Sequence, residues 1–180
     1  MKNALVLFAE GSEELETVSI VNILRRAGIN VTLAGLNDGV LRGSRGIAIQ
    51  PDTTLAAVLH NSYDMIVLPG GQPGTRNLRA DTRVLQLVQN MARDDKYVAA
   101  ICAAPAVLAT AGLLSGRQAT SFPGCLDEFS DVEIQSAAIV EDGKLITSRG
   151  PGTAMDFALL LIERLAGKAA REKVEAGLVR

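Results

Sequence analysis

The chain has 180 residues, which suits one domain with a sizeable core and is too short for a second full domain, so we expect a single domain over residues 1–180. Its 18 basic and 20 acidic side chains are well mixed and give a formal net charge of −2, which disfavours charge-driven binding of nucleic acid. The N-terminus has no signal-peptide pattern, and no apolar run reaches the roughly 18 residues of a membrane span, so we expect a cytoplasmic protein without a membrane partner.

Apolar runs rich in branched residues alternate with helical patterns in the first hundred residues. They predict strands over residues 4–8, 30–34, 63–68 and 97–101. Strands separated by helices are typical of a parallel sheet with helices on both faces. Between the second and third of these strands, the apolar pairs flanking a Gly-Ser-Arg-Gly turn at residues 43–46 predict a small β excursion.

After this excursion, Pro51, Asp52 and Thr53 are expected to cap a short helix. Residues 137–140 and 145–147 predict two further strands, because the Asp-Gly pair between them is a strong hairpin signal.

A helix over residues 153–165 and a polar tail helix from residue 168 complete the chain, with Gly167 between them. The whole pattern predicts one doubly wound, mostly parallel open sheet, in which ligands bind at the carboxyl ends of the strands.

Side chains able to carry chemistry are few. The chain has two cysteines, Cys102 and Cys125, and one histidine, His60. This set indicates neither a disulfide framework nor a zinc site, so we expect no bound metal, and any cysteine function must be that of a thiol.

Cys102 lies at the joint between the apolar strand at 97–101 and an apolar helix that opens with Pro105. A strand that turns directly into a helix exposes the joint residue, which is the geometry of a nucleophile elbow. The helix N-terminus would favour a thiolate and lower the pKa of this cysteine. The alternative is that Cys102 is a small buried hydrophobe, as most lone cysteines in apolar runs are.

Glu16 heads an apolar row in the first helix, which starts near Glu13 with Ser12 as its expected N-cap. The row continues through Ile20, Ile23 and Ala27, so the carboxylate should be at least partly desolvated. Burial raises a carboxyl pKa, and a protonated Glu16 could donate a hydrogen bond to the Cys102 sulfur. For Glu13 and Glu14, stabilisation of the helix start is a sufficient role.

Gly70 and Gly71 follow the third strand in a glycine-rich turn at the same sheet edge as Cys102. Their amides, with that of Ala103, could form an oxyanion site beside the sulfur. The segment is neither a phosphate-binding loop nor a dinucleotide fingerprint, and as an isolated signal it is weak because any sharp turn uses glycine.

Four segments of the chain together resemble the ThiJ/PfpI superfamily, and within it the parkinsonism-associated deglycase (DJ-one) branch, closest to its bacterial YajL-type members. They are residues 10–17 (EGSEELET), 67–71 (VLPGG), 99–105 (AAICAAP) and 147–153 (TSRGPGT). The resemblance covers nearly the whole chain. It implies a flavodoxin-like fold, a homodimer, Cys102 as oxidation-sensitive nucleophile, Glu16 as its protonated partner, and surrounding amides from Gly70, Gly71 and Ala103.

The activity that this resemblance implies is a cofactor-free glyoxalase III-like lyase or deglycase-type hydrolase. Its substrates would be methylglyoxal and glyoxal, or their early adducts on amines and thiols. Cys102 would form a hemithioacetal with the aldehyde, and Glu16 would move protons. Better-known animal members carry a histidine near the cysteine, and Phe122 stands in its place here, so turnover should be slow.

Two other residues and two other functions complete the expectations. His60 ends a helix and more plausibly covers that end than acts in catalysis, and Cys125 has no visible activating neighbour, so a structural role suits it better. The missing histidine also argues against a cysteine peptidase or amidotransferase. The leading alternative function is an oxidative-stress redox sensor with holding-chaperone activity, which needs only an accessible, low-pKa Cys102.

Overall fold

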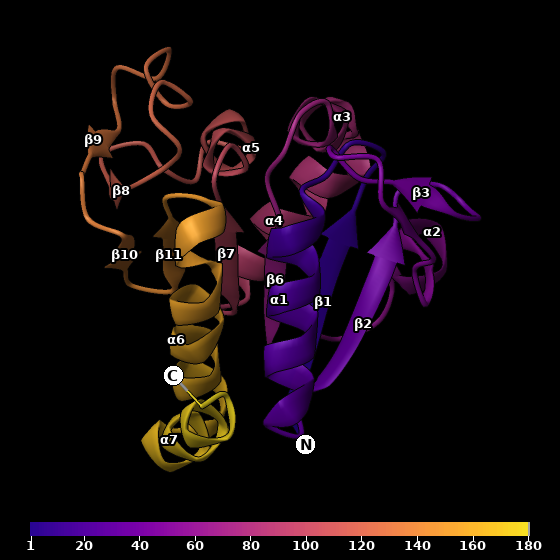
Figure 1. Ribbon diagram of the computed structural model, residues 1–180. Helices are drawn as coiled ribbons and strands as arrows, with labels where there is room; N and C mark the ends of the chain where they lie inside the picture. Colours follow the sequence, from indigo (N-terminus) through magenta and orange to yellow (C-terminus); the bar gives the residue numbers. More distant parts are fainter. Residues whose placement is uncertain (180) are drawn as a thin grey trace.

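A central sheet with helices on both faces forms the body of the protein (Figure 1). The computed structural model describes residues 1–179. Seven strands pair in the order β10-β11-β7-β6-β1-β2-β5, and only the β10–β11 pair is antiparallel. The strands of this sheet are β1 (Asn3–Phe8), β2 (Asn30–Gly35), β5 (Thr53–Thr54), β6 (Met65–Leu68), β7 (Tyr97–Ile101), β10 (Ile139–Asp142) and β11 (Leu145–Ser148). The predicted mostly parallel, doubly wound architecture is therefore confirmed.

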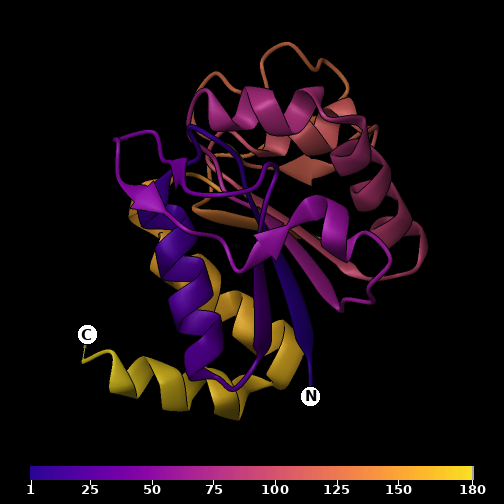
Figure 2. The same ribbon diagram turned by 90° about the vertical axis from the view of Figure 1, so that its right-hand side faces the viewer.

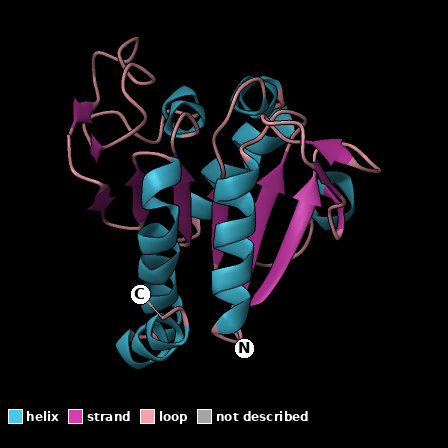
Figure 3. Ribbon diagram, viewed as in Figure 1, coloured by secondary structure: helices cyan, strands magenta, loops and turns pink. Residues whose placement is uncertain are grey.

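Two further strand pairs decorate the sheet (Figure 3). The predicted excursion at 40–49 is an antiparallel pair, β3 (Leu41–Arg42) with β4 (Ala48–Ile49). A second pair, β8 (Gln118–Ala119) with β9 (Glu133–Ile134), is parallel and was not predicted, because two-residue strands are too short to leave a period in the sequence.

The helices divide between the two faces of the sheet, as Figure 2 shows when the molecule is turned. The helices α1 (Glu14–Arg26), α6 (Ala154–Ala166) and α7 (Lys168–Gly177) share one apolar core, and α6 follows the short 3-10 turn η1 (Pro151–Thr153). The other core lies among α2 (Leu55–Val58), α3 (Gly74–Ala80), α4 (Thr82–Arg93) and α5 (Pro105–Thr110).

The position of strand β1 between the two cores explains why its sequence is apolar without interruption. Ala4, Val6 and Phe8 belong to one core, while Leu5 and Leu7 belong to the other, and all five are fully buried. Successive side chains of a strand point to opposite faces, so a strand covered on both sides needs apolar residues at every position.

Two predicted helix caps are wrong, and both side chains bind elsewhere. The Ser12 hydroxyl accepts a hydrogen bond from the Ala9 amide at 3.1 Å, and Glu13 occupies the N-cap position of α1 without a side-chain cap bond. The Asp52 carboxylate accepts from the Leu33 amide at 2.9 Å, while Thr54 caps α2. Ser12 binds back to a residue three positions earlier, and Asp52 binds to strand β2, so neither side chain is available to its helix.

None of the helices within residues 1–179 combines the length and the apolar character required to cross a membrane.

Candidate active site

Cys102 occupies the turn between β7 and α5, at the carboxyl end of the parallel strands. Its backbone has a φ of 64°, in the left-handed region that residues other than glycine rarely adopt. Its amide donates to the Ser148 carbonyl at 2.9 Å, and its carbonyl accepts from the Phe122 amide at 2.8 Å. Hydrogen bonds to two separate segments therefore hold the residue in a strained conformation at the strand-to-helix joint. The predicted exposure of Cys102 is wrong, because the residue is buried among the side chains of the core.

Glu16 is fully buried on α1, and its apolar row lies in the core as predicted. Its Oε2 accepts a hydrogen bond from the Gly70 amide at 2.7 Å. Its Oε1 has no hydrogen-bond partner among residues 1–179. The Cys102 side chain lies close enough to affect the pKa of this carboxyl group, so a proton on Glu16 could be donated to the sulfur.

Gly70 lies too close to Cys102 for any larger residue. A Cβ atom at this position would come within 2.6 Å of the Cys102 Cβ and 2.9 Å of the Ala103 nitrogen. The strand end after β6 therefore needs glycine at this position, because the turn at residue 102 packs directly on it. The predicted role of the Gly70 amide needs correction: it binds Glu16 and is not offered to a bound oxygen.

The amides of Gly71 and Ala103 are directed at the Cys102 sulfur and act to lower the pKa of the thiol. Burial, and after it the Glu16 carboxylate, act more strongly in the opposite direction and raise this pKa to about 12. The expected fall in the pKa of Cys102 is therefore wrong. The helix that begins at Pro105 has only six residues, and desolvation outweighs it.

Burial likewise raises the pKa of Glu16 to about 7, and the Gly70 amide and Cys102 oppose this rise. The two groups form one titrating pair. The Glu16 carboxyl loses its proton near pH 7, and the Cys102 thiol keeps its proton until strongly alkaline pH. Near neutrality the ionised carboxylate can therefore accept the thiol proton when the sulfur reacts, and hold it for later transfer.

Glu13 and Glu14 do more than stabilise the start of the helix. Both are buried, and both accept hydrogen bonds from the Ser44 hydroxyl. Glu14 also accepts from the amides of Arg45 and Ile47, at 2.8 and 3.0 Å. These bonds hold the turn between β3 and β4 beside the nucleophile. The acidic cluster at residues 13–16 was the available signal, but its partners lie about 30 residues away.

A cavity of about 440 Å³ opens over the sulfur. Cys102 is 8% exposed. Phe122 is 49% exposed and lines the cavity, at the position where the resemblance to the ThiJ/PfpI superfamily places a histidine in better-known animal members. Cys125 also lines it, whereas His60 lies exposed just after α2 and does not. The lining residues are Glu13, Ser44, Arg45, Gly71, Gln72, Cys102, Ala103, Phe122, Pro123, Cys125 and Pro151.

Comparison with known proteins agrees with this geometry. Residues 2–164 match the description of the DJ-1/PfpI family. The chain belongs to the DJ-1/PfpI family. It is 45% identical to protein dj-1beta of Drosophila melanogaster over 99% of this chain and 97% of that protein. The crystal structure of Drosophila melanogaster DJ-1beta superposes with a TM-score of 0.96 over 99% of this chain and 97% of that one, at 44% identity.

A more distant family member carries a name that describes an activity. A deglycase of Pyrococcus abyssi is 33% identical to this chain over 150 residues, which are 82% of this chain and 90% of that protein. The predicted family and flavodoxin-like fold are confirmed by these matches. Among residues 1–179, no three His, Cys, Asp or Glu side chains are grouped to hold a metal ion.

Proposed function

We propose that this protein is a cysteine-dependent, cofactor-free enzyme acting on reactive dicarbonyls, as a glyoxalase or deglycase on methylglyoxal, glyoxal or their early adducts. The observation that carries the proposal is the buried carboxyl of Glu16 beside Cys102. Cys102 in turn lines a cavity large enough for such a molecule. Membership of a family that includes a deglycase supports an enzyme of this type.

The reaction begins with the aldehyde of methylglyoxal in the cavity. With Glu16 ionised, its carboxylate takes the proton of the Cys102 thiol as the sulfur forms a C–S bond to the aldehyde carbon. The aldehyde oxygen becomes an alkoxide and takes that proton from Glu16, giving a hemithioacetal. The amides of Gly71 and Ala103 lie beside the sulfur, where they can bind the developing negative charge on that oxygen.

Glu16 then completes the proton transfers. Its carboxylate removes the proton from the carbon attached to sulfur and returns it to the neighbouring ketone carbon, while the hydroxyl proton passes to the ketone oxygen; together these two shifts convert the hemithioacetal into a thioester of lactate. Water adds to the thioester, the C–S bond breaks, and lactate and the thiol are released. The net reaction is methylglyoxal plus water giving lactate, and no electrons leave the substrate.

Phe122 limits the rate of this sequence. A histidine at this place would provide a base that titrates near pH 7, and a phenyl ring provides none. Glu16 must therefore serve every proton transfer, and we expect slow turnover.

The test is conversion of methylglyoxal to lactate by the purified protein, without glutathione. We expect Cys102→Ala to abolish it and Glu16→Gln to reduce it at least a hundredfold, as for removal of a general base. Glu133→Gln, an exposed carboxylate away from the cavity, is the matched control and should keep full activity. Lactate formation that survives Cys102→Ala would refute the proposal.

The second candidate is a cysteine redox sensor with holding-chaperone activity. One observation favours it: a protonated Glu16 would face a sulfinate oxygen formed on Cys102 and could donate to it. Mass spectrometry after mild peroxide treatment, in the parent and in Glu16→Gln, measures this. Cys125 in the same cavity is an internal comparison. Selective oxidation of Cys102 without lactate formation would support the sensor over the enzyme.

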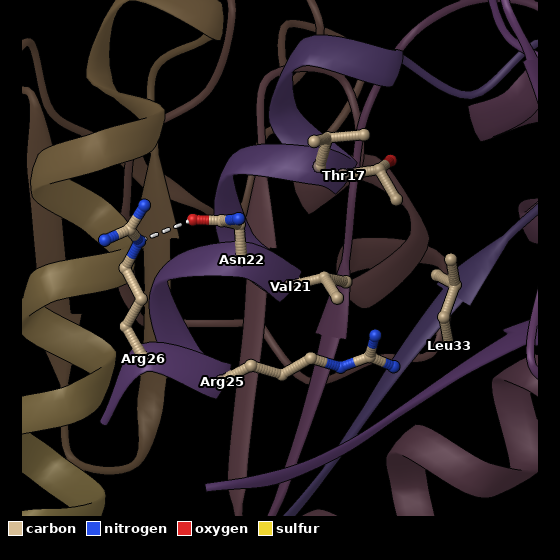
Figure 4. A pocket seen from close by; sticks show the side chains of 7 residues that line it. Thr17, Val21, Asn22, Arg25, Arg26 and Leu33 are labelled. Atoms are coloured by element: carbon tan, nitrogen blue, oxygen red, sulfur yellow. Dashed lines mark hydrogen bonds between the residues drawn. The ribbon is translucent and has the colours of Figure 1, made fainter. Parts of the chain in front are cut away.

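We also propose that the protein forms a homodimer through α1 and works in the cytoplasm, where thiols stay reduced. Leu15 and Val18 are each 53% exposed on this helix, and beside them lies a pocket of about 550 Å³ that includes Val21 and Leu33 (Figure 4). A two-fold interface would place Leu15 and Val18 of one copy against the pocket of the other. Light scattering of Val18→Glu, which should be monomeric, tests the interface.

A further inference from the structure

A second cavity, of about 400 Å³, lies on the α3 side of the nucleophile and takes no part in the chemistry described above. Helices α3 and α5 border it, and they lie beside one another at the end of the sheet where Cys102 turns (Figure 1). Gln72, Ala103 and Cys125 line both this cavity and the one over the sulfur. A molecule attached to Cys102 therefore needs to extend only past Ala103 to reach it.

The second cavity is lined by two arginines, and only one of them has an acidic partner within the described chain. Arg79 is paired with Glu128 at 2.6 Å and lies over the Phe129 ring at 5.2 Å, so its charge is compensated and its position fixed. Arg76 also lines the cavity, and no side chain within residues 1–179 pairs with its guanidinium. One uncompensated positive charge with its hydrogen-bond donors therefore remains.

Polar groups without partners accompany Arg76. The Thr75 hydroxyl is buried and has no hydrogen-bond partner within the described chain, and the exposed Gln72 amide offers two further donors. That hydroxyl oxygen has almost no accessible surface, so it can serve a ligand in the cavity only after its side chain rotates, whereas the Gln72 amide is open to the cavity. The lining thus offers donors and one net positive charge, which is what a carboxylate binds.

We propose that this cavity is an anion subsite, centred on Arg76, which binds the carboxylate of a substrate that reacts at Cys102. In terms of the proposed function, which this subsite extends, the favoured substrates are dicarbonyl adducts whose thiol or amine component carries a free carboxylate. The C–S bond to Cys102 forms at the former aldehyde carbon, the bond from that carbon to the thiol or amine breaks, and the thiol or amine leaves with the proton of Cys102. Arg45, which lines the cavity over the sulfur, is the competing anchor, but the Glu13 carboxylate lies 3.9 Å from its guanidinium and partly compensates its charge.

The first experiment measures the subsite without requiring turnover. Cys102 is alkylated with 3-maleimidopropionate or its neutral amide, and peptide mass spectrometry gives the rate at Cys102 alone. We expect the anionic reagent to react about threefold to tenfold faster, and added salt to weaken this preference because Arg76 is exposed. Arg76→Gln should abolish the preference, and Arg93→Gln, at the end of α4, should retain it.

Arg45→Gln distinguishes the two anchors: loss of the preference in this variant, with retention in Arg76→Gln, would overturn the assignment. Equal rates for both reagents in the parent would overturn it as well.

The second experiment compares kcat/KM for the methylglyoxal hemithioacetals of N-acetylcysteine and N-acetylcysteine amide. Preference for the carboxylate that disappears in Arg76→Gln supports the subsite. A different outcome is that the parent protein reacts faster with the anionic maleimide and yet turns over neither hemithioacetal. That result would refute the proposed enzyme and leave the anion subsite standing. Turnover of both at equal rates would refute the subsite and leave the enzyme.

Discussion

The buried carboxyl of Glu16 makes a quantitative prediction about stability. Its pKa is raised from an ordinary 4.5 to about 7, so the folded protein holds a proton that the unfolded chain has released over this interval. The penalty for burying the charge is absent below about pH 4.5, grows as the pH rises, and is complete above about pH 7. A difference of one between the folded and unfolded pKa values changes the free energy of unfolding by about 1.4 kcal/mol, so the Glu16 charge costs about 3 kcal/mol in total.

Glu16→Gln removes the charge and keeps an oxygen that can accept from the Gly70 amide. We expect the free energy of unfolding of this variant to gain about 2 kcal/mol on the parent between pH 5 and pH 7.5. Urea denaturation at several pH values measures it, with Glu133→Gln as the exposed control. If parent and variant show the same pH dependence, burial does not raise this pKa; if the parent gains stability with pH relative to the variant, the shift has the opposite sign.

Three further predictions concern the surroundings of the nucleophile. Gly70→Ala should destabilise the protein by about 1–3 kcal/mol and displace Cys102, measured as a lower Tm and slower alkylation; an unchanged Tm would show that the strand end can move. Glu14→Ala should speed hydrogen exchange selectively at the amides of residues 45–47, whereas uniform acceleration would indicate only global destabilisation. Phe122→His should raise kcat for methylglyoxal at least tenfold near pH 7, and an unchanged kcat would show that proton transfer is not limiting.

The sequence was sufficient to predict most of the sheet, because the longer parallel strands are apolar runs that alternate with helical patterns and the last two strands flank an Asp-Gly hairpin signal. It also predicted that Glu16 and Cys102 meet, since both follow parallel strands whose carboxyl ends share one edge. Their pKa values could not be predicted, because the balance between the helix end and desolvation depends on how completely α1 covers the sulfur.

The roles of Glu14 and Gly70 were also missed, for a related reason. Glu14 binds backbone amides near residue 45, and the Gly70 amide is used by a carboxylate 54 residues earlier in the chain. Contacts of this kind follow from the packing of loops, which carries no period in the sequence. The resemblance to a family supplied the residues of the site, and the structure supplied which atoms of those residues face one another.

The segment that carries Phe122 holds the nucleophile through its main chain. The bond to the Cys102 carbonyl comes from the Phe122 backbone amide, while the side chain is free to project into the cavity. Any residue except proline can supply that amide. Selection can therefore exchange the chemistry at this position, from a ring that only excludes water to a base, an acid or a ligand, without moving the sulfur. The cysteine and its scaffold can stay constant in evolution while the reaction they perform diverges.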